Sequence, residues 1–153
     1  MAAILPNPFA LKSNSNHRYL CYGAGRILQF TGQDPAPFFT TENAQTPGYM
    51  HIKYNAIGKY LVRVPGQTRP LLKIVATADT PNENTTDDNC TLFESENVGP
   101  NTPTQVVFRF RQVQSKLYIR PNYVQGLEGV LCALDANTDV NGVADLLTAV
   151  GPR

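Results

Sequence analysis

Apolar and polar positions alternate along much of the chain, in short runs separated by turn residues. Leu28, Gln29 and Phe30 show the pattern, and Phe108 to Arg111 repeat it. In a β-strand this period of two places one set of side chains on a buried face and the other set towards solvent. Because 12 Pro and 11 Gly are spread between the runs, long helices have little room. The pattern predicts many short strands joined by tight turns.

One segment recurs three times, in the order apolar strand, polar turn, then a basic residue, a tyrosine and an aliphatic residue. The first copy runs from Phe9 to Leu20, the second from Met50 to Val62 and the third from Phe108 to Ile119. A fixed separation of eight residues between a core position and the tyrosine predicts the same hairpin in each copy. The three pairs are Leu11 and Tyr19, Ile52 and Tyr60, and Phe110 and Tyr118.

Each copy is followed by a second pair of short apolar runs, with a polar loop between them. We therefore expect four strands in each of three units, which span approximately residues 9–48, 49–104 and 105–150 of a single domain covering 1–153. The runs of the second pairs are 27–30 and 38–40, 72–76 and 90–93, and 130–134 and 144–147.

Twelve short strands need an architecture that leaves no exposed sheet edge. Closing the sheet on itself removes the edges. Three similar units of this size are typical of a β-trefoil, in which a six-stranded barrel is capped by three hairpins. The fold class predicted is therefore all-β, and specifically a β-trefoil. A β-sandwich in which the repeated tyrosines are accidental is the alternative.

Charge and apolar content exclude two classes of partner. Lys and Arg number 13 against 12 Asp and Glu, a formal net charge of +1, so no strong field exists to gather nucleic acid or anionic lipid. Apolar runs stop far short of a membrane span, so membrane insertion is not expected. The first eight residues lack a basic flank and a sustained apolar stretch, so we expect cytoplasm, with access to the nucleus. Three cysteines without a CxxC pair fit reduced, buried thiols.

Catalytic and metal-binding motifs are weak. His51 alternates with apolar neighbours and is expected to face solvent or to form hydrogen bonds within a strand. The loop 135–142 imitates a calcium loop, but Val140 and Leu146 stand where the turn glycine and the bidentate acid belong. The acidic loop 77–89 is conceivable as a metal site, although charged loops are usually just solvated. We expect no catalytic residue, no metal and no cofactor.

Sugar binding needs only a shallow pocket, side chains that bridge hydroxyls and an aromatic face for the C–H edge of the ring. The chain has no Trp, so a tyrosine or phenylalanine must supply the face. Tyr22, Tyr54 and Tyr123 lie beside predicted turns and are the freest candidates.

Two blocks of sequence in the second unit are distinctive. The first runs from His51 through Lys59-Tyr60-Leu61-Val62-Arg63, and the second from Ile74 through Pro81-Asn82-Glu83-Asn84 to Cys90-Thr91-Leu92-Phe93. Both blocks resemble the agglutinin domain of amaranthin-type plant lectins. The segments around Leu11 to Leu20 and Leu28 to Phe30 are similar to the same family. The resemblance is strongest over the first two units, whereas from Val106 onward mainly the strand pattern matches.

The resemblance implies a β-trefoil from a plant, resident in nucleus and cytoplasm, that binds N-acetylgalactosamine or the Gal-GalNAc disaccharide without catalysing a reaction. It also implies a homodimer or a place within a multi-domain lectin, with sugar held where domains of opposite subunits meet. In the family, the loop that follows the KYLVR strand reaches the sugar. Here that loop is longer and lacks the expected aromatic residues. Its candidate sugar ligands are Gln67, Thr68, Arg69 and Lys73.

Two other functions stay open at this point. The same trefoil, with its rigid loop from Pro65 to Pro70, suits a protein-interaction or inhibitor module that binds no sugar. An enzyme would need a concealed triad, and no paired carboxylates stand out in the sequence.

Overall fold

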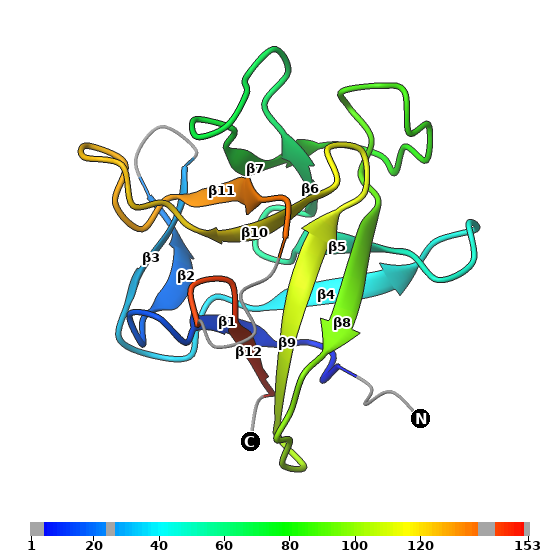
Figure 1. Ribbon diagram of the computed structural model, residues 1–153. Coiled ribbons are helices and arrows are strands. Elements are labelled where there is room, and N and C mark those ends of the chain that lie inside the picture. Colours follow the sequence, from blue (N-terminus) through cyan, green and yellow to red (C-terminus); the bar gives the residue numbers. More distant parts are fainter. Residues whose placement is uncertain (1–4, 24–26, 138–142, 152–153) are drawn as a thin grey trace.

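The computed structural model describes residues 5–23, 27–137 and 143–151, which form twelve β-strands joined by turns and loops. Four strands fall within each of the ranges 9–48, 49–104 and 105–150, which we call unit 1, unit 2 and unit 3 (Figure 1). The strands are β1 (Ala10–Ser13), β2 (Tyr19–Tyr22), β3 (Leu28–Gly32), β4 (Phe39–Asn43), β5 (Met50–Tyr54), β6 (Lys59–Arg63), β7 (Ile74–Ala78), β8 (Phe93–Asn97), β9 (Gln105–Gln112), β10 (Leu117–Pro121), β11 (Leu131–Asp135) and β12 (Leu147–Val150).

The first and fourth strands of the units form a six-stranded antiparallel barrel. β1 pairs with β12, β12 with β9, β9 with β8, β8 with β5, and β5 with β4. The ring is completed by Phe9 and Phe39, which exchange two backbone hydrogen bonds of 2.8 and 2.7 Å. The barrel therefore closes where unit 1 begins.

The second and third strands of each unit form a hairpin, and the three hairpins β2–β3, β6–β7 and β10–β11 cap the barrel (Figure 1). Each hairpin touches the next through a single antiparallel bridge. The bridges join Ile27 to Val75, Lys73 to Cys132, and Val130 to Gln29. Because they use equivalent positions of the three hairpins, the cap has pseudo-threefold symmetry. This is the predicted β-trefoil.

The constant eight-residue spacing has a local cause in the turn between the first two strands of each unit. His17, Gly58 and Lys116 occupy equivalent positions and have positive φ angles of 60°, 66° and 62°. The amide of each residue donates to the carbonyl oxygen four residues earlier, at 2.9 Å in all three cases. Only Gly58 reaches this left-handed conformation without steric cost.

A β-bulge follows the repeated tyrosine in every unit. The register shifts between Tyr19 and Leu20, between Tyr60 and Leu61, and between Tyr118 and Ile119. A bulge bends its strand and increases the local twist. This device redirects each chain segment from the barrel into the cap.

One apolar core fills the barrel and the base of the cap. Equivalent positions in the three units supply most of it, and six phenylalanines contribute its largest fully buried side chains. These phenylalanines are Phe9, Phe30, Phe39, Phe93, Phe108 and Phe110.

Most strands begin within two residues of the expected runs, and two strands are displaced further. The fourth strand of unit 2 was expected at 90–93 and that of unit 3 at 144–147, but both strands begin at the last residue of those runs. Turn hydrogen bonds cause the shift, since the Cys90 amide donates to Asp87 at 3.0 Å and the Leu146 amide to Val143 at 3.1 Å. The earlier apolar residues pack under these loops instead of entering the ladder.

Cys90 and Cys132 are buried free thiols, as expected, whereas Cys21 is half-buried. No helix in the described residues has the length and apolar character needed to cross a membrane.

Candidate functional site

Internal hydrogen bonds give the loop 64–73, between β6 and β7, a defined shape. The Val64 amide donates to the Lys73 carbonyl at 3.0 Å, and the Lys73 amide donates to Gln67 Oε1 at 3.0 Å. The Arg63 guanidinium donates to the Gln67 carbonyl oxygen and, at 2.9 Å, to Gln114 Oε1. Gln67 therefore serves largely to hold the loop in place.

A second loop, after β10, is tied to the first through one buried side chain. Asn122 is 4% exposed and donates through Nδ2 to the Pro70 carbonyl at 2.7 Å. Its Oδ1 accepts from the Val124 amide at 2.8 Å. An amide satisfied on both sides fixes the two loops relative to each other.

The two loops enclose a cleft of about 320 Å³, lined by Arg69, Pro70, Tyr123, Leu134 and Asp135. We call it the Tyr123 cleft. The Tyr123 side chain is 65% exposed, an unusual exposure for an aromatic residue. Arg69 Nη1 donates to the Leu134 carbonyl at 3.3 Å, which holds one wall of the cleft against the other.

Charged groups surround the exposed ring of Tyr123. The Arg120 guanidinium carbon lies 5.2 Å from the ring centroid, within the range of a cation–π contact. Arg120 Nη1 also lies 3.4 Å from Asp135 Oδ2. The cleft thus combines an aromatic face, the Arg69 guanidinium and a carboxylate, with the Arg120 guanidinium beside the ring. Such groups can stack on a sugar ring and bridge its hydroxyls.

A second groove, of about 420 Å³, lies between the hairpins of units 1 and 2. Tyr22, 38% exposed, lines it together with Ile57, and Lys59 and Asp79 form an ion pair there. We call it the Tyr22 groove. It occupies the same kind of place as the Tyr123 cleft, because each lies where two neighbouring cap hairpins meet.

The expectation that Tyr54 is free beside a turn is wrong. Its side chain is 6% exposed and stacks on Phe39, with ring centroids 5.3 Å apart. Burial is also the main cause of its raised pKa. Tyr54 also packs against Tyr22, with ring centroids 5.5 Å apart, so its buried ring is not accessible to a ligand.

The other predicted sugar ligands lie at different places in the structure. Arg69 and Tyr123 meet in one cleft, Tyr22 lies in the other groove, and Thr68 is exposed on the loop without lining either. Lys73 lies at the bridge to β11, where its backbone pairs with Cys132. Sequence analysis did not find Asp135 or Arg120 as site residues. In the sequence, Asp135 is the first residue of the calcium-like loop.

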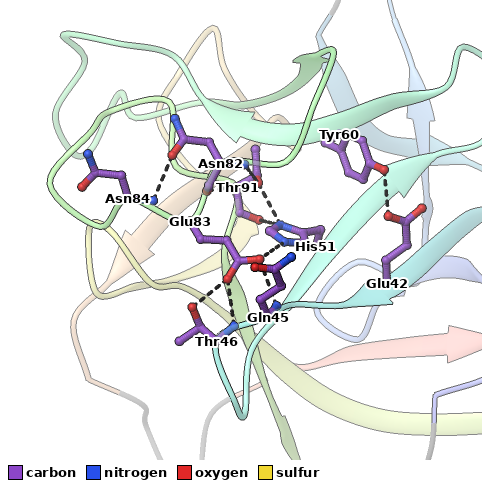
Figure 2. A network of polar contacts seen from close by, with 9 residues as sticks. All are labelled: Glu42, Gln45, Thr46, His51, Tyr60, Asn82, Glu83, Asn84 and Thr91. Atoms are coloured by element: carbon purple, nitrogen blue, oxygen red, sulfur yellow. Dashed lines mark hydrogen bonds and ion pairs between the residues drawn. The ribbon is translucent and has the colours of Figure 1, made fainter.

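The acidic loop 77–89 is anchored and not merely solvated (Figure 2). His51 is 2% exposed, and its Nε2 donates to Glu83 Oε2 at 3.1 Å, while its Nδ1 lies 2.8 Å from Thr91 Oγ1. Glu83 Oε1 also accepts from the Thr46 hydroxyl at 2.7 Å, and the amides of Gln45 and Thr46 donate to the same carboxylate.

These donors stabilise the ionised carboxylate of Glu83. The hydrogen bond from Thr46 and the two backbone amides lower its pKa to about 2. The hydrogen-bonding alternative for His51 is therefore the one that the structure shows. No three His, Cys, Asp or Glu side chains gather as a metal site in the described ranges. The end of the calcium-like loop, 138–142, lies outside those ranges.

The six-stranded barrel, its three-hairpin cap and the open clefts between hairpins define a β-trefoil. The chain belongs to the family of the agglutinin domain, whose model matches residues 3–150. Comparison with curated protein sequences gives no match.

Three solved structures share the fold at low sequence identity. A salivary protein from Culex quiquefasciatus of the Cysteine and Tryptophan-Rich family is 16% identical, with a TM-score of 0.70 and 99% of each chain covered. The designed threefold symmetric protein ThreeFoil is 9% identical, with a TM-score of 0.70 over 95% of this chain and 99% of that one. SeviL, solved with the asialo-GM1 saccharide, is 15% identical, with a TM-score of 0.61 over 97% and 99%. At such identities the likeness supports the fold alone.

Proposed function

We propose that this agglutinin domain binds glycans containing N-acetylgalactosamine, including Gal-GalNAc-type disaccharides, and catalyses no reaction on them. The observation that carries the proposal is the exposed Tyr123 ring, set in a cleft with Arg69 and Asp135. Membership of the agglutinin family supports sugar binding, and the structural neighbour SeviL was solved with a saccharide.

The cleft supplies each element that a shallow sugar site needs. The Tyr123 ring offers an apolar face to the C–H edge of a pyranose. Asp135 offers carboxylate oxygens to hydroxyl groups, and the guanidinium of Arg69 offers donors to ring or acetamido oxygens. Tyr123 thus replaces the loop aromatic that the sequence between 64 and 73 lacks.

The same geometry argues against glycoside hydrolysis. A hydrolase of the usual kind places two carboxyl groups on either side of the scissile bond. The described lining of the Tyr123 cleft holds one carboxylate, Asp135, and Arg120 already pairs with it.

A single open cleft of this size gives weak binding, so useful affinity requires two or more sites presented together. We therefore propose that the domain acts as a homodimer or as part of a multi-domain lectin. Residence in the nucleus and cytoplasm belongs to the same proposal, and imaging of the tagged full chain tests it.

Titration with N-acetylgalactosamine by isothermal calorimetry tests the sugar site. We expect millimolar or tighter binding to the wild type and at least about tenfold weaker binding to Tyr123→Ala. Tyr22→Ala, in the other groove, is the matched control and should bind as the wild type does. No binding to the wild type, or a loss confined to Tyr22→Ala, contradicts the proposed site.

A further inference from the structure

The contacts between neighbouring units, which we call seams, repeat around the barrel, and one of them differs. Each seam joins the fourth strand of one unit to the first strand of the next. Strand register places three residues at one equivalent position of the fourth strands. They are Glu42 opposite His51, Glu96 opposite Arg109, and Val150 opposite Ala10.

At two seams the repeated tyrosine donates to a glutamate at this position. The Tyr60 hydroxyl donates to Glu42 Oε1 at 2.7 Å, and the Tyr118 hydroxyl donates to Glu96 Oε2 at 3.2 Å. The Glu42 contact is also the leading cause of the raised pKa of Tyr60. An acidic acceptor for the tyrosine is therefore a regular feature of the fold of this chain.

A basic residue completes the arrangement. Lys53 Nζ lies 5.6 Å from the Tyr60 ring centroid and 4.0 Å from Glu42 Oε2. At the next seam, Arg111 pairs with Glu94 at 2.7 Å. At these seams the carboxylate therefore accepts a hydrogen bond from the phenol, and a basic side chain nearby offsets the carboxylate's charge.

The seam between unit 3 and unit 1 keeps the cation and the phenol but has lost the acid. Lys12 Nζ lies 5.9 Å from the Tyr19 ring centroid, as Lys53 does from Tyr60. β12 carries Thr148 and Val150 where β8 carries Glu94 and Glu96. Among the described residues, no ion pair includes Lys12 and no hydrogen bond includes the Tyr19 hydroxyl.

A cavity opens where the acid is missing. It measures about 370 Å³, a size suited to a monosaccharide, and both Tyr19 and Val150 line it. Phe38 and Pro35 add apolar walls, and Thr104 and Gln105 add groups that can bond hydroxyls. None of its described lining residues is acidic.

We propose that this cavity binds a sugar that carries a carboxylate, such as a uronic acid or a sialic acid. The ligand's carboxylate takes the place that Glu42 and Glu96 fill at the other seams, accepting from Tyr19 and facing Lys12. The ring lies against Phe38 and Pro35. That the ligand is a sugar rests on the proposed lectin function, whereas the carboxylate follows from the seam itself.

The test titrates the folded wild-type chain with glucuronic acid and with N-acetylneuraminic acid and records NMR spectra. Galactose and acetate are titrated in the same way for comparison. We expect shifts in the amides of Tyr19, Gln105 and Val150, and at least fivefold weaker binding of galactose and of acetate. No binding of either acidic sugar at millimolar concentration overturns the proposal. Acetate binding as tightly as glucuronate overturns the assignment to a sugar.

The variant Val150→Glu restores the missing internal partner. It should weaken acidic-sugar binding at least tenfold while leaving N-acetylgalactosamine at the Tyr123 cleft unaffected. Lys12→Gln, which removes a half-buried charge, should weaken the same binding several-fold even if Val150→Glu does not fold. Unchanged binding in the folded variants overturns the site. Loss of N-acetylgalactosamine binding alone, with the acidic sugar still bound, overturns only the proposed function.

Discussion

The seam around Tyr60 and the seam around Tyr19 have the same backbone arrangement, but the first is filled by polar side chains and the second is not. At the first, Glu42 accepts from the tyrosine and His51 holds Glu83, so the phenol, the imidazole and both carboxylates have protein partners (Figure 2). At the second, Ala10 and Val150 replace the polar residues, and a cavity remains. Both seams still contribute buried apolar side chains to the core, Ile52 at the first and Leu11 at the second.

The difference shows that equivalent positions of a repeated scaffold can serve different purposes, with some stabilising the fold and others leaving room for a ligand. Where side chains satisfy each other, as around Glu83, those groups hold the loop in place. Where an element of the repeat is missing, a shaped space with unpaired donors remains. The two loops around the Tyr123 cleft follow the same logic, since Asn122 fixes their backbones and Tyr123 stays exposed.

The largest expected effect comes from breaking the buried ion pair of Arg109, the residue that lies opposite Glu96 at the filled seam between units 2 and 3. Arg109 Nε donates to Asp145 Oδ1 at 2.9 Å, and both side chains are buried. Asp145→Ala leaves the guanidinium buried with only the longer contact to Glu96, so we expect a loss of about 3 kcal/mol in unfolding free energy. Urea denaturation measures it, with Asp34→Ala, at an exposed position of unit 1, as the control. A loss no larger than that of the control contradicts the prediction.

Removing the exposed ring should change binding and not stability. Tyr123→Ala is expected to weaken N-acetylgalactosamine binding by at least about 1.4 kcal/mol, or tenfold. The melting temperature should stay close to that of the wild type, because 65% of the side chain is exposed. A large drop in melting temperature instead shows that Tyr123 supports the loop structure.

The two tyrosine hydroxyls should differ in their contribution to stability. Tyr60→Phe removes a hydrogen bond to Glu42 and should cost about 1 kcal/mol of unfolding free energy. Tyr19→Phe removes a hydroxyl that has no partner among the described hydrogen bonds, so its cost should be near zero. Chemical denaturation of both variants makes the comparison, and equal losses contradict the account of the seams.

Acid should weaken the anchoring of the loop 77–89. Since the folded pKa of Glu83 lies near 2 and its ordinary value is 4.5, its contribution is complete above pH 4.5 and disappears as the pH falls towards 2. Denaturation curves across that window should show stability falling with pH, less steeply in Glu83→Gln. Glu128→Gln, on another exposed loop, controls for the removal of one carboxylate. An identical pH profile in Glu83→Gln and the wild type is the contrary result.

Most of the fold was predictable because the core and turn residues of the repeat recur at fixed spacing in the sequence. The eight-residue spacing to Tyr19, Tyr60 and Tyr118 corresponds to one turn geometry and one bulge in all three units. The starts of β8 and β12 were not predictable, because the same apolar residues suit a strand or a packed loop. Turn hydrogen bonds from the Cys90 and Leu146 amides to the carbonyls of Asp87 and Val143 decide between the two.

The site was less predictable because it depends on contacts between loops distant in sequence. Arg69 and Tyr123 were each candidates, but nothing local indicates that Asn122 brings their loops together. Tyr54 shows the converse, since a position beside a turn does not reveal that its ring packs on Phe39. Asp135 became a site residue only through the pairing of β10 with β11.

The central claim is that the domain binds glycans through the Tyr123 cleft, and an NMR titration of the ¹⁵N-labelled chain with N-acetylgalactosamine tests it most directly. The account predicts saturable shifts at the amides of Arg69, Leu71, Tyr123 and Asp135, with those around Glu83 unchanged. Spectra that stay the same at millimolar sugar, or that change only at the Tyr22 groove, would contradict it.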